Sequence, residues 1–224
     1  METISRTPRT TVVRHRERGR YERDTVNAII DEALICHVGF TVEGQPYVLP
    51  TTHARLDDRL YLHGSAVNRM LKSLKAGAPV CVTLTLLDGL VLARSAMHHS
   101  MNYRSAVVLG IASEVTDDNE KRSALQALVN HVVRGRASEV RPPNAQELKA
   151  TSVLCLPIEE ASAKMRQGPP IEDEADYSLT CWAGVLPLQL HPGPPIDDPR
   201  LAFGTQVPCE VAAYERGRSK TSIA

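Results

Sequence analysis

Apolar residues follow a helical period in the segment after Asp24, a suitable N-cap residue. They recur at intervals of three and four, which places them on one face of a helix. The members of this face are Val26, Ile29, Ile30, Ala33 and Leu34. From Ile35 onward the spacing changes to that of strands, so the helix is expected to end there.

Three strands are expected next, over residues 35–42, 46–56 and 59–63. Glu43-Gly44 and Asp57-Asp58 separate them and are residue types that tight turns require. A short helix should follow, with an apolar face and a glycine at its end. Its face and stop are Met70, Leu71, Leu74 and Gly77.

Strands over 79–87 and 90–97 flank Asp88-Gly89, a strong signal for a two-residue hairpin turn. A further apolar strand is expected over 104–115, and Asp117 should open a long amphipathic helix.

Toward the C-terminus, Asn144 should cap a short helix, and 152–158 should be the last clear strand. A helix is expected over 159–167, closed by Gly168-Pro169-Pro170. Beyond Leu190 the chain is rich in proline, so this tail is expected to be extended or disordered.

The order of these elements predicts a mainly β protein with flanking helices. Hairpin-linked strands without βαβ alternation favour an antiparallel barrel. We divide the chain into a basic N-terminal segment (1–23), a barrel domain (24–190) and a proline-rich tail (191–224). The basic segment is either an anion-binding arm or a solvated, loosely docked segment, and the second interpretation is favoured.

Charge and cysteine content narrow the function classes. The 26 basic and 26 acidic residues balance, so neither nucleic acid nor a membrane surface is expected as a partner. The five cysteines are odd in number and form no C-x-x-C pair, which disfavours a disulfide framework or a structural zinc site. With no long apolar stretch and no apolar signal core, the protein is expected to be cytoplasmic.

The segment Leu60–Lys72 carries the clearest chemistry. A strand ends in His63, Gly64 and Ser65, and a helix with Asn68 and Arg69 begins directly after it. Free N–H groups at a helix start, a hydroxyl, an amide and a guanidinium together suit a phosphate monoester. An ordinary N-cap followed by solvated basic residues explains the same pattern about equally well.

Two further segments are candidates for lining a site. In His98–Ser105, adjacent histidines on a strand point to opposite faces, so no metal is expected there. Tyr103, Arg104 and Ser105 begin a core strand that could line a cofactor cleft. Trp182, the single tryptophan, is either a core or interface anchor or the wall of a site for a flat ring.

The chain resembles the pyridoxamine 5′-phosphate oxidase-like, FMN-binding split-barrel superfamily, and is most similar to its nitroimidazole-reductase branch. The likeness spans roughly residues 14–190. The stretches that carry it are CHVGFTVEGQPYVLPTTHA (36–54), LYLHGSA (60–66), HHSMNYRSAVVLG (98–110) and WAGVLPL (182–188).

The resemblance implies a six-stranded antiparallel split barrel and a homodimer with FMN between the subunits. By position, a strand formed by Pro50, Thr51, Thr52 and His53 would run along the isoalloxazine edge. The phosphate would be held by His63, Gly64, Ser65, Asn68 and Arg69. The partner subunit would line the cofactor with Tyr103, Arg104 and Ser105. Trp182 would lie near the cleft. The family often has two basic residues where this chain has Asn68 and Arg69, so phosphate affinity is expected to be weaker unless Lys72 or an N-terminal arginine compensates.

The leading hypothesis is an FMN-dependent reductase of a small molecule. A nicotinamide donor would bind transiently, because no Rossmann fingerprint is present. No catalytic acid or base can be named from the sequence. The basic C-terminal motif of true pyridoxamine 5′-phosphate oxidases is missing, so vitamin B6 synthesis is not predicted.

Three alternatives stay open. One is a haem-binding or haem-degrading protein that uses His53, His63 or His98 as axial ligand. Another is a flavin-binding module without turnover. The third keeps the reductase but replaces FMN with FAD or a deazaflavin.

Overall fold

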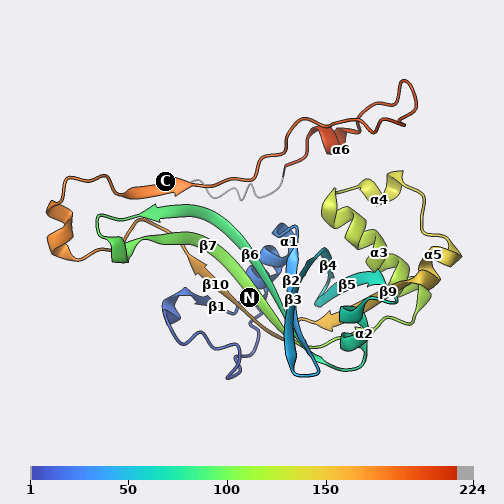
Figure 1. Cartoon of the computed structure of the whole chain (residues 1–224), viewed down its shortest axis with the longest axis horizontal. Coiled ribbons are helices and arrows are strands. Elements are labelled where there is room, and N and C mark those ends of the chain that lie inside the picture. Colours follow the sequence, from blue (N-terminus) through green and yellow to red (C-terminus); the bar gives the residue numbers. More distant parts are fainter. Residues whose placement is uncertain (1, 216–224) are drawn as a thin grey trace.

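A computed structural model describes residues 2–215. It contains two antiparallel sheets with helices at their margins (Figure 1). The helices are α1 (Arg23–Glu32), α2 (Arg69–Lys75), α3 (Asp118–Val132), α4 (Arg136–Glu139), α5 (Ala145–Ala150) and α6 (Cys209–Ala212), with short 3-10 turns η1 (Arg16–Arg18), η2 (Ala96–His98) and η3 (Glu174–Ser178).

The larger sheet has the strand order β1-β10-β7-β6-β2-β3, with β11 also paired to β6. The smaller sheet has the order β4-β5-β9-β8. The strands are β1 (Gly19–Arg20), β2 (Cys36–Val42), β3 (Gln45–Thr51), β4 (His53–Leu56), β5 (Arg59–Ser65), β6 (Pro79–Leu92), β7 (Ser100–Ile111), β8 (Ser113–Glu114), β9 (Thr151–Pro157), β10 (Glu160–Arg166) and β11 (Gly184–Pro187). The predicted mainly β, antiparallel split barrel is confirmed; short edge strands raise the strand number above six.

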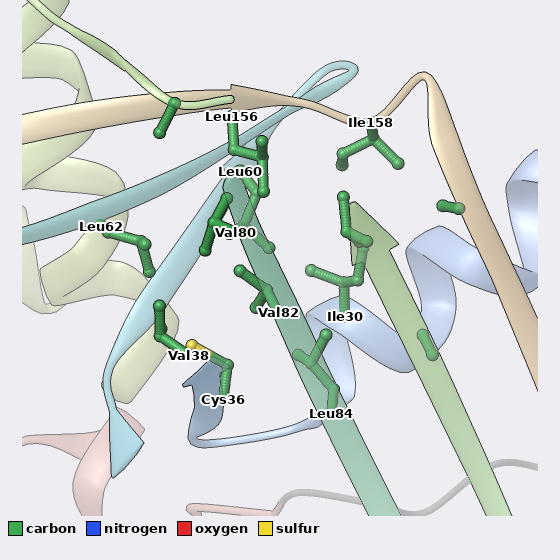
Figure 2. Packing of buried hydrophobic residues seen from close by; sticks show 14 of the residues in the cluster. Ile30, Cys36, Val38, Leu60, Leu62, Val80, Val82, Leu84, Leu156 and Ile158 are labelled. Carbon is green, nitrogen blue, oxygen red and sulfur yellow. The ribbon is translucent and has the colours of Figure 1, made fainter. Parts of the chain in front are cut away.

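One apolar core lies between the two sheets. Ile30 of α1 lies beside Val82 and Leu84 of β6, while Leu60 and Leu156 reach Val80 from the smaller sheet (Figure 2). Each of these side chains is almost completely buried. The alternation of buried positions along β2 and β6 follows from the period of two in a strand that buries one face.

The other side of the larger sheet faces away from this core, and we call it the outer face. Register fixes its members, because residues paired across neighbouring strands point to the same side. On the four strands β3, β2, β6 and β7 these positions are Pro46, Val48, Pro50, His37, Gly39, Thr41, Cys81, Thr83, Thr85, Leu87, Tyr103, Ser105, Val107 and Leu109.

Several local predictions are confirmed. Glu43 and Gly44 both have positive φ and form the turn between β2 and β3. Asn68, Asp117 and Asn144 each accept a backbone hydrogen bond as N-caps of α2, α3 and α5. Asp24, in contrast, lies inside the first turn of α1, and Glu22 takes the cap position without a side-chain hydrogen bond.

Three element predictions are wrong. The strand expected over 46–56 is interrupted at Thr52, and its two parts, β3 and β4, belong to different sheets. Asp88-Gly89 forms no hairpin turn; β6 continues through it with a bulge, because β7 and β11 pair with it on both sides. The helix expected over 159–167 is strand β10, since β7 and β1 on either side bind its backbone.

The N-terminal segment is docked against β10. Ile4 is buried in the core, and Arg9 and Thr7 both bind the Glu160 carboxylate. No helix within residues 2–215 is both long enough and apolar enough to cross a membrane.

Leu62→Ala should lower the free energy of unfolding by about 2–5 kcal/mol, because Leu62 is fully buried between the two sheets. Val13→Ala, at a side chain that is 71% exposed, should change it by less than about 0.5 kcal/mol. Urea denaturation checks both values. Equal unfolding midpoints for the two variants would contradict the core described here.

Candidate functional site

The break at Thr52 brings two of the predicted site segments together. His53 on β4 pairs with Leu62 on β5, and the strands are antiparallel. The chain before His53 therefore runs beside the chain after Leu62. Thr51 and Thr52 thus lie close to His63 and Gly64, at the junction between the two sheets.

The start of α2 completes this cluster, which we call the α2 cluster (residues 50–53, 63–65 and 68–69). The Asn68 side chain accepts a hydrogen bond from the Leu71 N–H group at 3.3 Å, so it is engaged as the N-cap. Gly64 packs closely on α2, because a Cβ atom there would lie 3.1 Å from Leu71 Cδ1. Ser65 and Arg69 are exposed, and none of the nine cluster residues is acidic.

Arg69 is held in place by a stack of aromatic rings. Its guanidinium carbon lies 4.4 Å from the centre of the Tyr47 ring, a cation–π contact. Tyr47 in turn stacks on Phe40, a core residue, with ring centres 5.6 Å apart. The stack fixes the guanidinium beside the start of α2 and leaves its N–H donors directed toward solvent or a ligand.

The two histidines of the cluster differ in environment. His53 is fully buried, and its Nε2 atom lies 2.8 Å from the Ile30 carbonyl oxygen. His63 is half-buried, and its buried Nδ1 atom has no hydrogen-bond partner within residues 2–215. Burial lowers the pKa of His63 below its ordinary value of 6.5, so its imidazole is neutral near pH 7.

The predicted β7 residues divide between two sides of the sheet. Tyr103 and Ser105 lie on the outer face, whereas Arg104 points toward α1. The Arg104 guanidinium binds the Glu32 carboxylate at 2.8 Å and the Asp88 carboxylate at 2.7 and 3.0 Å. These two acids raise the pKa of Arg104, so its charge is already matched by carboxylates within the chain.

Within one chain, the α2 cluster and the β7 residues do not meet. Strands β2 and β6 lie between β3 and β7, which places these strands three strand spacings apart, roughly 14 Å. Trp182 lies on a third segment, just before β11, and is 67% exposed; its ring packs against Gly184.

Comparison with known families decides the classification. The sequence model of the family described as pyridoxamine 5′-phosphate oxidase matches residues 22–165, more than half of the chain. The chain belongs to this family. A comparison with curated proteins finds no significant match.

Two solved structures match far more of the chain than the family region. The flavocytochrome Anf3 from Azotobacter vinelandii is 40% identical, with a TM-score of 0.88, over 94% of this chain and 98% of that one. The FAD and heme binding protein from Mycobacterium smegmatis is 35% identical, with a TM-score of 0.83, over 87% and 95%.

A third structure represents the nitroimidazole branch that the sequence analysis named. A putative 5-nitroimidazole antibiotic resistance protein from Bacteroides thetaiotaomicron is 28% identical, with a TM-score of 0.55. The match covers 64% of this chain and 83% of that one. The predicted superfamily is therefore confirmed.

Sequence reasoning missed two features of the site region. Tyr47 supports Arg69, but in the sequence it is one residue of an expected strand, and nothing in the pattern links it to Arg69. A groove of about 740 Å³ also runs along the edge of β6, and sequence spacing gave no signal for it because its walls are distant segments. Those walls include residues 32–35, 85–88 and 188–192, with Arg104 among them.

The ring protons of His63 should titrate below pH 6.5, because burial disfavours the imidazolium. Since the unfolded chain then binds a proton more readily than the folded one, His63 should lower stability as the pH falls below 6.5. An NMR titration of the imidazole, assigned with His63→Gln, measures the midpoint. A midpoint at or above 6.5 would contradict the burial described here.

Proposed function

We propose that this protein binds both a flavin and a haem and transfers electrons between them. The observation that carries the proposal is the extent of the match to two relatives. The flavocytochrome and the FAD and heme binding protein align with most of this chain, including residues beyond the family region that ends at 165. A shared barrel alone would not account for likeness of that length.

The α2 cluster fits a flavin phosphate by its donor chemistry. Ser65 offers a hydroxyl, Arg69 a guanidinium already placed by Tyr47, and the start of α2 offers backbone N–H groups. The cluster contains no carboxylate that would repel an anion. Pro50, Thr51 and Thr52 of the same cluster would then lie along the ring system, as expected for this family.

FAD is favoured over FMN, because one of the two long matches is described as an FAD and heme binding protein. The α2 cluster is open to solvent at Ser65, Asn68 and Arg69, which leaves room for a second phosphate and a nucleoside. FMN, the narrower expectation from the sequence, is the competing ligand in the titration below.

His63 is the best placed of the three candidate haem ligands. Its imidazole is kept neutral by burial, as iron coordination requires, and Nδ1 has no competing partner within residues 2–215. His53 is enclosed in the core beside Ile30, and the Nδ1 atom of His98 lies 2.8 Å from Ser95 Oγ.

When bound, a flavin supplies two-electron and one-electron transfer and a haem supplies one-electron transfer. The chain's own residues orient these groups: Arg69 and Ser65 fix the phosphate, and His63 presents a neutral nitrogen. We further propose that the protein is a homodimer. The β7 residues Tyr103 and Ser105 of one subunit would then face the α2 cluster of the other, and a nicotinamide donor would bind only transiently.

Arg69→Ala should raise the dissociation constant for FAD more than tenfold, because a charge-assisted contact is worth about 1.5–3 kcal/mol. The dissociation constant of Arg69→Lys should lie between those of the wild type and Arg69→Ala, since lysine keeps the charge but loses the planar donors. Quenching of flavin fluorescence, with FAD and FMN in parallel, measures the constants. Arg122→Ala on α3 is the control, and an unchanged affinity in Arg69→Ala would exclude Arg69 from the site.

Haem loading should give the protein a Soret band that is lost in His63→Ala and kept in His98→Ala. The reason is that burial keeps the His63 imidazole neutral and its buried Nδ1 atom has no hydrogen-bond partner within residues 2–215, whereas the Nδ1 atom of His98 lies 2.8 Å from Ser95 Oγ. Absorption spectra of the three proteins after haem addition test this, with FAD affinity as a separate readout. A full Soret band in His63→Ala would remove His63 as the ligand.

A further inference from the structure

The outer face carries no acidic or basic side chain other than His37. Its fourteen positions on β3, β2, β6 and β7 include no Asp, Glu, Lys or Arg. Charged residues return on β10, where Glu160, Lys164 and Arg166 pair with Leu109, Ser105 and Tyr103. Solvent-exposed surfaces are normally about one quarter to one third charged, whereas the centres of protein interfaces are depleted of charge. The outer face therefore has the composition of an interface.

A second uncharged surface comes from the C-terminal part of the same chain. We call residues 188–208 the strap. One end is fixed where the Leu188 N–H group donates to the Asp88 carbonyl oxygen at 3.0 Å, directly after β11. The other end leads into α6, where Glu210 lies next to Gly135 beside α4. Between these ends the strap runs extended along the molecule (Figure 1).

The strap presents large apolar side chains that this chain does not cover. Ile196 is 94% exposed, and Phe203 is completely exposed. Five large apolar residues of the strap are exposed: Leu190, Ile196, Leu201, Phe203 and Val207. At on the order of 100 Å² each they present about 500 Å². In a two-fold dimer each partner also buries its outer face, and the two surfaces together reach the roughly 800 Å² that one partner buries in a standard interface.

We propose that the strap of each chain packs on the outer face of a second copy of the same chain, beside the Pro50, Tyr103 and Ser105 positions that the proposed function assigns to the flavin site. This rests on the homodimer of the proposed function and adds which segment builds it. In a two-fold dimer each chain supplies one strap and one uncharged sheet face. The strap of the first chain then covers the face of the second, and the strap of the second covers the face of the first. Prolines at 192, 194, 195 and 199 keep the strap extended, which reduces the entropy lost on docking.

The double variant Ile196→Asp/Phe203→Asp in the full chain tests the strap. It should raise the dissociation constant of the dimer at least 100-fold, because two carboxylates would be placed against an uncharged face. Val13→Asp/Val140→Asp, at exposed apolar positions outside the strap, should stay within threefold of the wild type. Sedimentation velocity over a concentration series gives the constants, and circular dichroism confirms folding of both variants. A dimer of wild-type strength in the strap variant would overturn the proposal.

A photo-crosslinking residue at position 203 identifies the surface that the strap touches. The expected product has twice the chain mass of 24.6 kDa, with adducts on outer-face peptides that contain Val48 or Val107. Adducts confined to the same chain, or to peptides off the outer face, would overturn the proposal.

FAD affinity, read on the same variants, separates the strap from the proposed function. A strap variant that still dimerises and binds FAD disproves the strap alone. A wild-type protein that is monomeric at every concentration disproves the strap and the homodimer together. Loss of FAD binding in the wild type would disprove the proposed flavin function.

Discussion

The close approach of the two sheets is the constraint on which the rest of the structure depends. Leu156 of the smaller sheet packs so tightly on β7 that a Cβ atom at Gly110 would lie 2.9 Å from Leu156 Cδ1. A larger residue at this point would displace the Leu156 side chain within the core that Ile30, Val80 and Leu60 also fill.

Because side chains alternate along a strand, each side chain of the larger sheet points either toward the core or away from it. On β6, Val80, Val82 and Leu84 face the core, so Cys81 and Thr83 between them must face outward. On β7 the same rule sends Arg104 toward Glu32 and Asp88 and leaves Tyr103 and Ser105 on the outer face. The predicted cofactor residues are therefore spread over two surfaces of one chain.

Several charged side chains of this neutral chain form ion pairs with neighbouring side chains. Two sets of part-buried ion pairs brace the long strand pair β6–β7. One joins Arg104 to Glu32 and Asp88, and the other joins Arg94 to the fully buried Glu172 side chain. Such pairs hold geometry more than they add net stability, because desolvation offsets much of the attraction. Arg69 differs, since it rests on the Tyr47 ring and forms no ion pair within residues 2–215.

The sequence by itself determined the fold class, the caps at Asn68, Asp117 and Asn144, the turn at Glu43-Gly44 and the change from strand to helix between Ser65 and Arg69. Each depends on local chemistry or on a strand period that neighbours cannot change. Only the tertiary structure decided that Thr52 interrupts a strand, that β6 passes through Asp88-Gly89 and that β10 is not a helix. At these places hydrogen bonds from neighbouring strands outweigh local propensity. The support of Arg69 by Tyr47 likewise joins residues that only the folded chain brings into contact.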